Sequence, residues 1–170
     1  MVLDKNLILV GYSGHSYVLI DSALENGYNF LGYTENKIQS KNPFNLTYLG
    51  HELNENFDYW NLSEYFVIGI GNNHIREKIF FYLKNKNKKI VSIIDKSSSI
   101  SKSCTIGSGT FINKNVIINA FSSVGNNSIL NSGCIIEHDC TLGNSVHVDP
   151  GAVVTGNVKI GDRTFIGANS

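Results

Sequence analysis

An acid, a histidine and a second acid stand side by side in CIIEHDCTLG, the stretch from residue 134 to 143. A histidine titrates near neutral pH, and a carboxylate that hydrogen-bonds one ring nitrogen fixes the tautomer and raises the basicity of the other nitrogen. His138 with Asp139 is therefore a candidate general base, while the alternative is an exposed histidine beside acids that takes no part in chemistry. A second histidine, His147, follows nine residues later.

The segments around this group follow a period of six residues. From residue 100 onward every sixth position is aliphatic: Ile100, Ile106, Ile112, Ile118, Val124, Leu130, Ile136, Leu142, Val148, Val154, Ile160 and Ile166. A slim side chain comes four places after each aliphatic, and the place directly after it is mostly Gly or Asn, which tolerate left-handed backbone. This pattern predicts a triangular parallel β-helix with three hexapeptides per coil, in about four coils.

The candidate base departs from this repeat. Glu137 occupies the place that Gly or Asn fills in most repeats, and His138 points outward from the coil. Thr155, eighteen residues after Glu137, is a second exception on the same predicted face. We expect both histidines and the acid to gather around one corner of the prism, and such departures from a local pattern are typical of functional sites.

The cysteines fit the repeat as filler. Cys104, Cys134 and Cys140 take the slim inward position, form an odd count and have no Cys-x-x-Cys spacing. They therefore predict buried thiols, with neither a disulfide framework nor a zinc knuckle, and no cysteine nucleophile.

The first half of the chain has a different sequence pattern. Predicted strands and helices alternate in two rounds, over residues 7–10, 15–26 and 29–33 and then over 65–70, 73–83 and 90–94. This order predicts a small parallel sheet of the Rossmann type that binds ligands at the carboxyl ends of its strands. We place the domains at 1–95 and 96–170. The turn GYSGHS lacks the full G-x-G-x-x-G fingerprint and is weak evidence for a dinucleotide.

Composition excludes several partners. Lys and Arg together number 14, as do Asp and Glu, so there is no basic surface for nucleic acid or anionic lipid. The first apolar run, residues 7–10, is too short for a signal peptide or a membrane span. We expect a cytoplasmic protein.

The whole chain resembles the NeuD/PglD-like family of bacterial sugar acetyltransferases. The matching segments are LVGYSGHSYVLIDSALENGYNFLGYTE (9–35), IGIGNNHIREKI (68–79) and, most specifically, LNSGCIIEHDCTLGNSVHVDPGAVVTGNVKIG (130–161). The resemblance implies a Rossmann-like nucleotide-sugar-binding domain, then a left-handed β-helix, with active sites between protomers of a homotrimer. Relatives continue for further coils beyond the repeats that reach Ser170, so C-terminal coils are expected to be missing from this chain.

The resemblance also implies residue roles. His138 would take the proton from a sugar amine that attacks the thioester of acetyl-CoA, and Asp139 would orient the imidazole. His147 and Gly156 would contact acetyl-CoA, with the glycine N–H at the acetyl oxygen. The residues implied at the nucleotide sugar are Gly11, Ser13, Gly14, His15, Glu35 and Asn131.

Alternatives remain open at this point. Arg76 is expected either to meet phosphate or to be a solvated helix charge. The first functional candidate is an N-acetyltransferase acting on a nucleotide-linked amino sugar for surface glycan or glycoprotein assembly. Sialic acid O-acetylation and a non-catalytic nucleotide-sugar-binding trimer are the alternatives. A hexapeptide carbonic anhydrase needs three histidines around zinc, and the β-helix has two, so no metal is expected.

Overall fold

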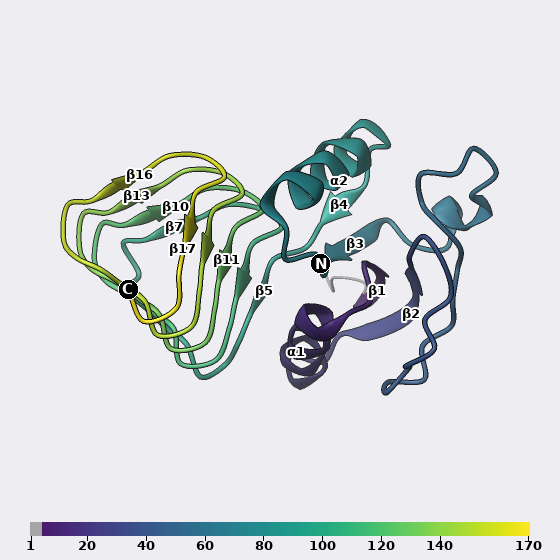
Figure 1. Ribbon diagram of the computed structural model, residues 1–170, viewed down its shortest axis with the longest axis horizontal. Helices are drawn as coiled ribbons and strands as arrows, with labels where there is room; N and C mark the ends of the chain where they lie inside the picture. The colour runs from purple at the N-terminus through teal and green to yellow at the C-terminus, as the bar shows by residue number, and fades with distance from the viewer. Residues whose placement is uncertain (1–4) are drawn as a thin grey trace.

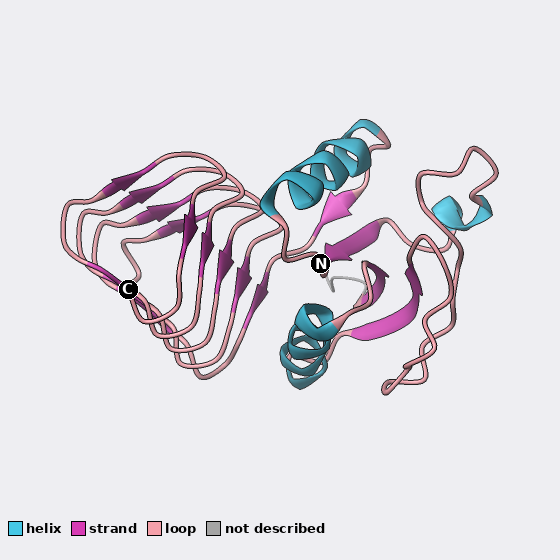
Figure 2. Ribbon diagram, viewed as in Figure 1, coloured by secondary structure: helices cyan, strands magenta, loops and turns pink. Residues whose placement is uncertain are grey.

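The protein consists of an α/β layer packed against one side of a triangular prism, as the ribbon of the computed structural model shows (Figure 1). The structure describes residues 5–170. Helices occur only in the α/β layer, and the prism is built from short strands joined by turns (Figure 2). No helix within residues 5–170 is long and apolar enough to cross a bilayer.

The α/β layer is a parallel four-stranded sheet with a helix on each face. Its strand order is β2 (Asn29–Thr34), β1 (Asn6–Val10), β3 (Tyr65–Ile68) and β4 (Lys89–Ile90), and its helices are α1 (Gly14–Glu25), α2 (Asn73–Asn85) and the short 3-10 helix η1 (Asp58–Asn61). Leu7 packs with α1, whereas Ile8 on the opposite face packs with α2. Because β1 is covered on both faces, its sequence is a continuous apolar run.

Three parallel sheets form the sides of the prism. Face 1 contains β5 (Ile93–Ile94), β8 (Phe111–Ile112), β11 (Ile129–Leu130), β14 (His147–Val148) and β17 (Phe165–Ile166). Face 2 contains β6 (Ser99–Ile100), β9 (Ile117–Ile118), β12 (Ile135–Ile136) and β15 (Val153–Val154). Face 3 contains β7 (Thr105–Ile106), β10 (Ser123–Val124), β13 (Thr141–Leu142) and β16 (Lys159–Ile160). Paired residues differ by eighteen positions, which confirms three hexapeptides per coil.

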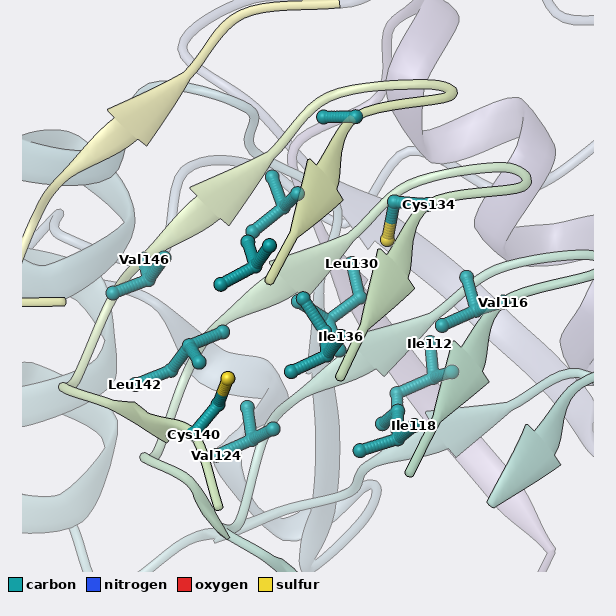
Figure 3. Packing of buried hydrophobic residues seen from close by; sticks show 13 residues of the cluster. Ile112, Val116, Ile118, Val124, Leu130, Cys134, Ile136, Cys140, Leu142 and Val146 are labelled. Atoms are coloured by element: carbon teal, nitrogen blue, oxygen red, sulfur yellow. The ribbon is translucent and has the colours of Figure 1, made fainter. Parts of the chain in front are cut away.

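From β6 onward the second residue of each strand points into the prism, where it packs with the slim residues (Figure 3). Cys134 and Cys140 are fully buried among them, which confirms their predicted positions. Burial raises the pKa of the Cys134 thiol to about 12, so this cysteine is a poor nucleophile at neutral pH.

The left-handed residues differ from the sequence-based expectation. From Ile106 onward they lie three places after the inward aliphatic, as at Asn115, Phe121 and Asp139, rather than directly after it. Where glycine occupies the place directly after it, the reason is close stacking of coils, since a Cβ on Gly107 would lie 2.5 Å from the backbone nitrogen of Asn126. Asn113 at the equivalent place instead donates to Asn131 and Ser132 in the next coil. Corner conformation and coil stacking are therefore separate requirements.

The strand expected over 90–94 is two elements. β4 pairs with β3 in the α/β sheet, whereas β5 pairs with β8 in the prism. The chain passes from one unit to the other between Ile90 and Ile93. β4 and β5 each lie at the edge of their own parallel sheet. The domain division at 95 and 96 stays a prediction, and the pairing favours an earlier one between Ile90 and Ile93.

Candidate active site

The candidate base lies on an exposed corner of the prism between β12 and β13. The His138 side chain is 62% exposed, and its Nδ1 lies 2.9 Å from Asp139 Oδ2. Asp139 is the left-handed residue of this corner, with φ 59°. Since a carboxylate accepts hydrogen bonds, Nδ1 carries the proton and Nε2 is left as the basic nitrogen. The outward orientation that the sequence predicted is confirmed.

Gly156 lies one coil beyond His138, directly against the imidazole. A Cβ at Gly156 would lie 2.7 Å from both Nε2 and Cε1 of His138. The backbone N–H of Asn157 donates to the His138 carbonyl at 2.9 Å, which fixes the spacing of the two coils. A side chain at 156 would therefore displace the exposed ring from this position.

We expect Gly156→Ala to lower the rate of acetyl transfer by roughly 10- to 100-fold, because an ångström-scale shift of a general base costs about this much. The Gly161→Ala variant is the matched control, since a Cβ there meets nothing within 4 Å and the backbone is not left-handed. Turnover numbers and thermal midpoints of both variants provide the measurement. Equal turnover in the two variants would contradict the placement of the ring.

The second histidine does not share this corner. His147 lies on β14 of face 1, is 7% exposed, and its Nδ1–H donates to the Gly71 carbonyl at 3.3 Å. Nine residues are half a coil, so His138 and His147 lie on different sides of the prism. The expectation that both gather around one corner is wrong for a single protomer.

His147 instead lines a cavity of about 420 Å³ between the prism and the start of α2. The cavity is lined by Gly71, Asn72, Asn73, His74, His147, Arg163 and Phe165. His147 Nε2 lies 3.1 Å from Asp149 Oδ1 but is not aligned for a hydrogen bond, and no other group in residues 5–170 bonds to it. This interdomain cavity therefore offers an unsatisfied ring nitrogen to a ligand or water.

His15 also points toward face 1. Its ring lies 5.7 Å from the ring of Phe111 and 6.1 Å from that of His147, measured between centroids. The pKa of His15 is lowered to about 4, mainly by desolvation and further by the nearby His147 and Arg76. Desolvation and Arg76 also lower the pKa of His147. Both histidines are therefore neutral where the two units meet.

These pKa values predict acid sensitivity. An unfolded histidine takes up a proton near pH 6.5, whereas folded His15 resists protonation down to about pH 4, so stability falls as pH falls across this range. The thermal midpoint should drop steadily from pH 7 to pH 4, and His15→Gln should flatten that dependence. The exposed His74→Gln serves as the control. An unchanged slope in His15→Gln would contradict the burial of His15 in neutral form.

The residues around the turn after β1 that were predicted to contact the nucleotide do not all lie at one site. Gly11 has φ 85° and lines a cavity of about 210 Å³ at the carboxyl ends of β1, β2 and β3, together with Glu35. Ser13 and Gly14 are exposed at the start of α1, and His15 turns away to face 1. Glu35 Oε2 accepts a hydrogen bond from the Tyr12 N–H at 3.2 Å. The structure thus brings Gly11 and Glu35 together at this strand-end cavity, and it places His15 elsewhere.

Asn131 lies at the corner between faces 1 and 2, away from His138. Its Oδ1 accepts hydrogen bonds from Asn113 Nδ2 and the Ser132 N–H, both at 2.9 Å. This ladder joins stacked coils. The role of Asn131 near the sugar stays a prediction.

Both expectations for Arg76 are wrong. Its side chain is 1% exposed. The guanidinium donates to the carbonyls of Ile70 and Gly71 and to Asn73 Oδ1 in the α/β layer, and to the carbonyls of Asn127, Ser145 and Val146 in the prism. Helical spacing could have shown this, because Arg76 shares a stripe of α2 with the buried Ile79 and Leu83. Arg76 thus holds the two units together.

Comparison with known proteins agrees with both halves of the fold. Residues 6–83 match the PglD N-terminal domain, and residues 139–170 match the six-repeat bacterial transferase hexapeptide. The acetyltransferase domain of PglB from Neisseria gonorrhoeae is 26% identical, with a TM-score of 0.87 over 97% of this chain and 80% of that one. The chain belongs to the NeuD/PglD-like family.

Two further solved structures are similar to this chain. The same PglB domain, solved with acetyl coenzyme A, has a TM-score of 0.88 at 26% identity, covering 98% of this chain and 80% of that one. A mutant of perosamine N-acetyltransferase from Caulobacter crescentus, solved with CoA and GDP-perosamine, shares the fold at 24% identity, with a TM-score of 0.84 over 96% and 86% of the two chains. This NeuD/PglD-like protein is accordingly an acetyltransferase by class. Within residues 5–170 no group of three His, Cys, Asp or Glu side chains could hold a metal ion.

Proposed function

We propose that this protein is an acetyl-CoA-dependent N-acetyltransferase acting on a nucleotide-linked amino sugar. The observation that carries the proposal is the His138 corner, where an exposed imidazole is oriented by Asp139 and lies against Gly156. Acetyl coenzyme A bound to the PglB domain, at 26% identity, supports the choice of donor. Acetyl-CoA is a cytoplasmic metabolite, so we place the reaction there, in surface glycan or glycoprotein assembly.

The proposed reaction proceeds by direct attack. The amine nitrogen forms a bond to the thioester carbonyl carbon, and His138 Nε2 takes the proton that the amine loses. The Gly156 N–H stabilises the oxyanion that develops on the carbonyl oxygen, a contribution of about 3 kcal/mol for one donor. The carbon–sulfur bond then breaks, and CoA leaves as a thiol after taking the proton from His138. Buried Cys134 and Cys140 take no part, and the direct attack needs no acyl-enzyme.

The site that we propose lies between two copies of the chain. The corners that lead into β13 and β16 lie on the far side of the prism from the α/β layer (Figure 1). His138 therefore cannot reach a sugar whose nucleotide is held at the strand-end cavity of its own protomer. If the strand-end cavity holds the acceptor, it must be the cavity of a neighbouring copy.

The outer surface of face 2 supports such an assembly. Its outward residues Ile117 and Val153 are 38% and 47% exposed, whereas the corresponding residues of face 3 include Thr141 and Lys159. Phe121, at the same corner as His138, is 71% exposed. Apolar surface of this kind is normally covered in the functional protein. We therefore propose a homotrimer in which face 2 and this corner pack against the next copy.

The experiment that tests the function is an acceptor panel. The protein is incubated with acetyl-CoA and, in turn, UDP-, GDP- and dTDP-linked amino sugars or free sialic acid, and thiol release is measured. N-acetylation predicts release with an amino sugar and a product stable to hydroxylamine. Release with sialic acid and a hydroxylamine-labile product would instead establish O-acetylation, and nucleotide-sugar binding without release would establish a non-catalytic binder.

A further inference from the structure

A buried acid that the proposed reaction does not use lines the strand-end cavity. Glu52 is 3% exposed, and its Oε2 accepts no hydrogen bond from any described residue. Its Oε1 lies 3.9 Å from His51 Nε2. Thr34, which also lines the cavity, is fully buried with its hydroxyl unpaired among residues 5–170. Buried polar groups are normally satisfied, so two unsatisfied ones at one cavity indicate a ligand.

The cavity has the shape and lining that suit a heterocyclic base. It lies at the carboxyl ends of parallel strands, where ligands of this kind of sheet bind. Its apolar walls come from Val10, Leu53, Ile70, Ile75 and Ile79. Its volume, about 210 Å³, is below the roughly 300 Å³ of a site for a whole drug-sized ligand. It therefore fits one part of a nucleotide sugar, a flat apolar ring with polar groups along one edge.

The Glu52 carboxylate favours some nucleobases over others. An ionised carboxylate only accepts hydrogen bonds, and its two oxygens can take a pair of parallel donors. Guanine presents two adjacent donors, N1–H and the N2 amine. Uracil and thymine present a single N–H flanked by two carbonyl oxygens, which a carboxylate repels, and adenine presents one amine beside an acceptor nitrogen.

We infer that the strand-end cavity binds guanine, with the Glu52 carboxylate accepting from N1–H and the N2 amine and the Thr34 hydroxyl facing the same base. The inference rests on the proposed function and narrows its acceptor to GDP-linked amino sugars. Glu35, whose carboxylate already accepts the N–H groups of Tyr12 and Asn36, lies at the same cavity and is left for the ribose.

Calorimetry with free nucleotides and no acetyl-CoA tests the inference. GDP should bind about 10- to 100-fold more tightly than UDP or ADP, the range expected for one bidentate pair. IDP, which lacks only the N2 amine, should fall between GDP and UDP.

A change of one residue should also change the base that is preferred. Glu52→Gln is isosteric but offers one donor and one acceptor, which match the C2 carbonyl and N1–H of xanthine. The variant should lose affinity for GDP and bind XDP more tightly than GDP. Glu55→Gln, an exposed change in the same segment, should keep the wild-type preference. A purely structural Glu52 would weaken all nucleotides alike and would not reverse the order.

Equal affinities, tighter UDP binding, no measurable binding of GDP, or a Glu52→Gln variant that keeps the wild-type order would each overturn the inference. The outcome is separate from that of acetyl transfer. Thiol release with a UDP-linked amino sugar would support the proposed function and contradict the preference for guanine. GDP binding without thiol release from any acceptor would support the preference for guanine and contradict the proposed function.

Discussion

The His138→Ala variant is expected to lose acetyl transfer activity by about a hundredfold or more, because it removes the general base that takes the proton from the amine. The fold should be unaffected, since the side chain is 62% exposed and its one polar contact is to Asp139. The measurement is kcat from CoA release, beside the thermal midpoint and the molecular mass of the assembly.

The two neighbouring acids allow a comparison, in which Glu137 is the matched control. Asp139→Asn should lower kcat, because an amide orients the imidazole less firmly than a carboxylate does. Glu137→Gln should be nearly silent, because the Glu137 carboxylate accepts from Asn119 Nδ2 at 3.0 Å in the coil ladder and does not contact His138. A kcat of His138→Ala within tenfold of wild type would show that His138 is not the general base.

The largest expected effect on stability comes from Arg76→Met. Arg76 is buried, and desolvation lowers its pKa to about 10. Methionine fills similar space but leaves the carbonyls of Asn127 and Ser145 unsatisfied. Each unsatisfied buried group costs about 1–3 kcal/mol, and relief of the desolvated charge offsets part of the sum. We expect a loss of about 3 kcal/mol in the free energy of unfolding, measured in urea.

Arg163→Met is the control for that measurement. Arg163 is 44% exposed and pairs with Glu77 at 3.0 Å. Exposed ion pairs contribute about 0–1 kcal/mol, so this variant should unfold close to wild type. Comparable losses in both variants would show that Arg76 does not hold the two units together in the way its hydrogen bonds indicate.

The prism was predictable because one residue pattern repeats every six positions. One aliphatic position in six determines the inward face, and the same period places Cys134 and Cys140 in the core and His138 outside. The conformation within each corner was not predictable from Gly and Asn alone. Those residues satisfy coil stacking at one place and left-handed backbone at another, and composition does not separate the two causes.

The site was predictable only where the chain repeats itself locally. His138, Asp139 and Gly156 stay together because neighbouring residues and residues one coil apart are always adjacent. His147 was misplaced because half a coil leads to another side of the prism. Glu52 was missed because its segment has no regular period, and its burial depends on how that segment folds over the sheet.

In the proposed assembly, His138 of one copy acts on a sugar held by another copy. Its most direct test is subunit mixing between His138→Ala and Ile75→Trp, in which tryptophan at the half-exposed wall of the strand-end cavity blocks the acceptor. Each variant alone should be inactive. If the site is shared, random mixed trimers at equal ratio should recover about a quarter of the wild-type sites, since one site in four then pairs an intact histidine with an intact cavity. Mixed trimers as inactive as their parents would contradict the claim.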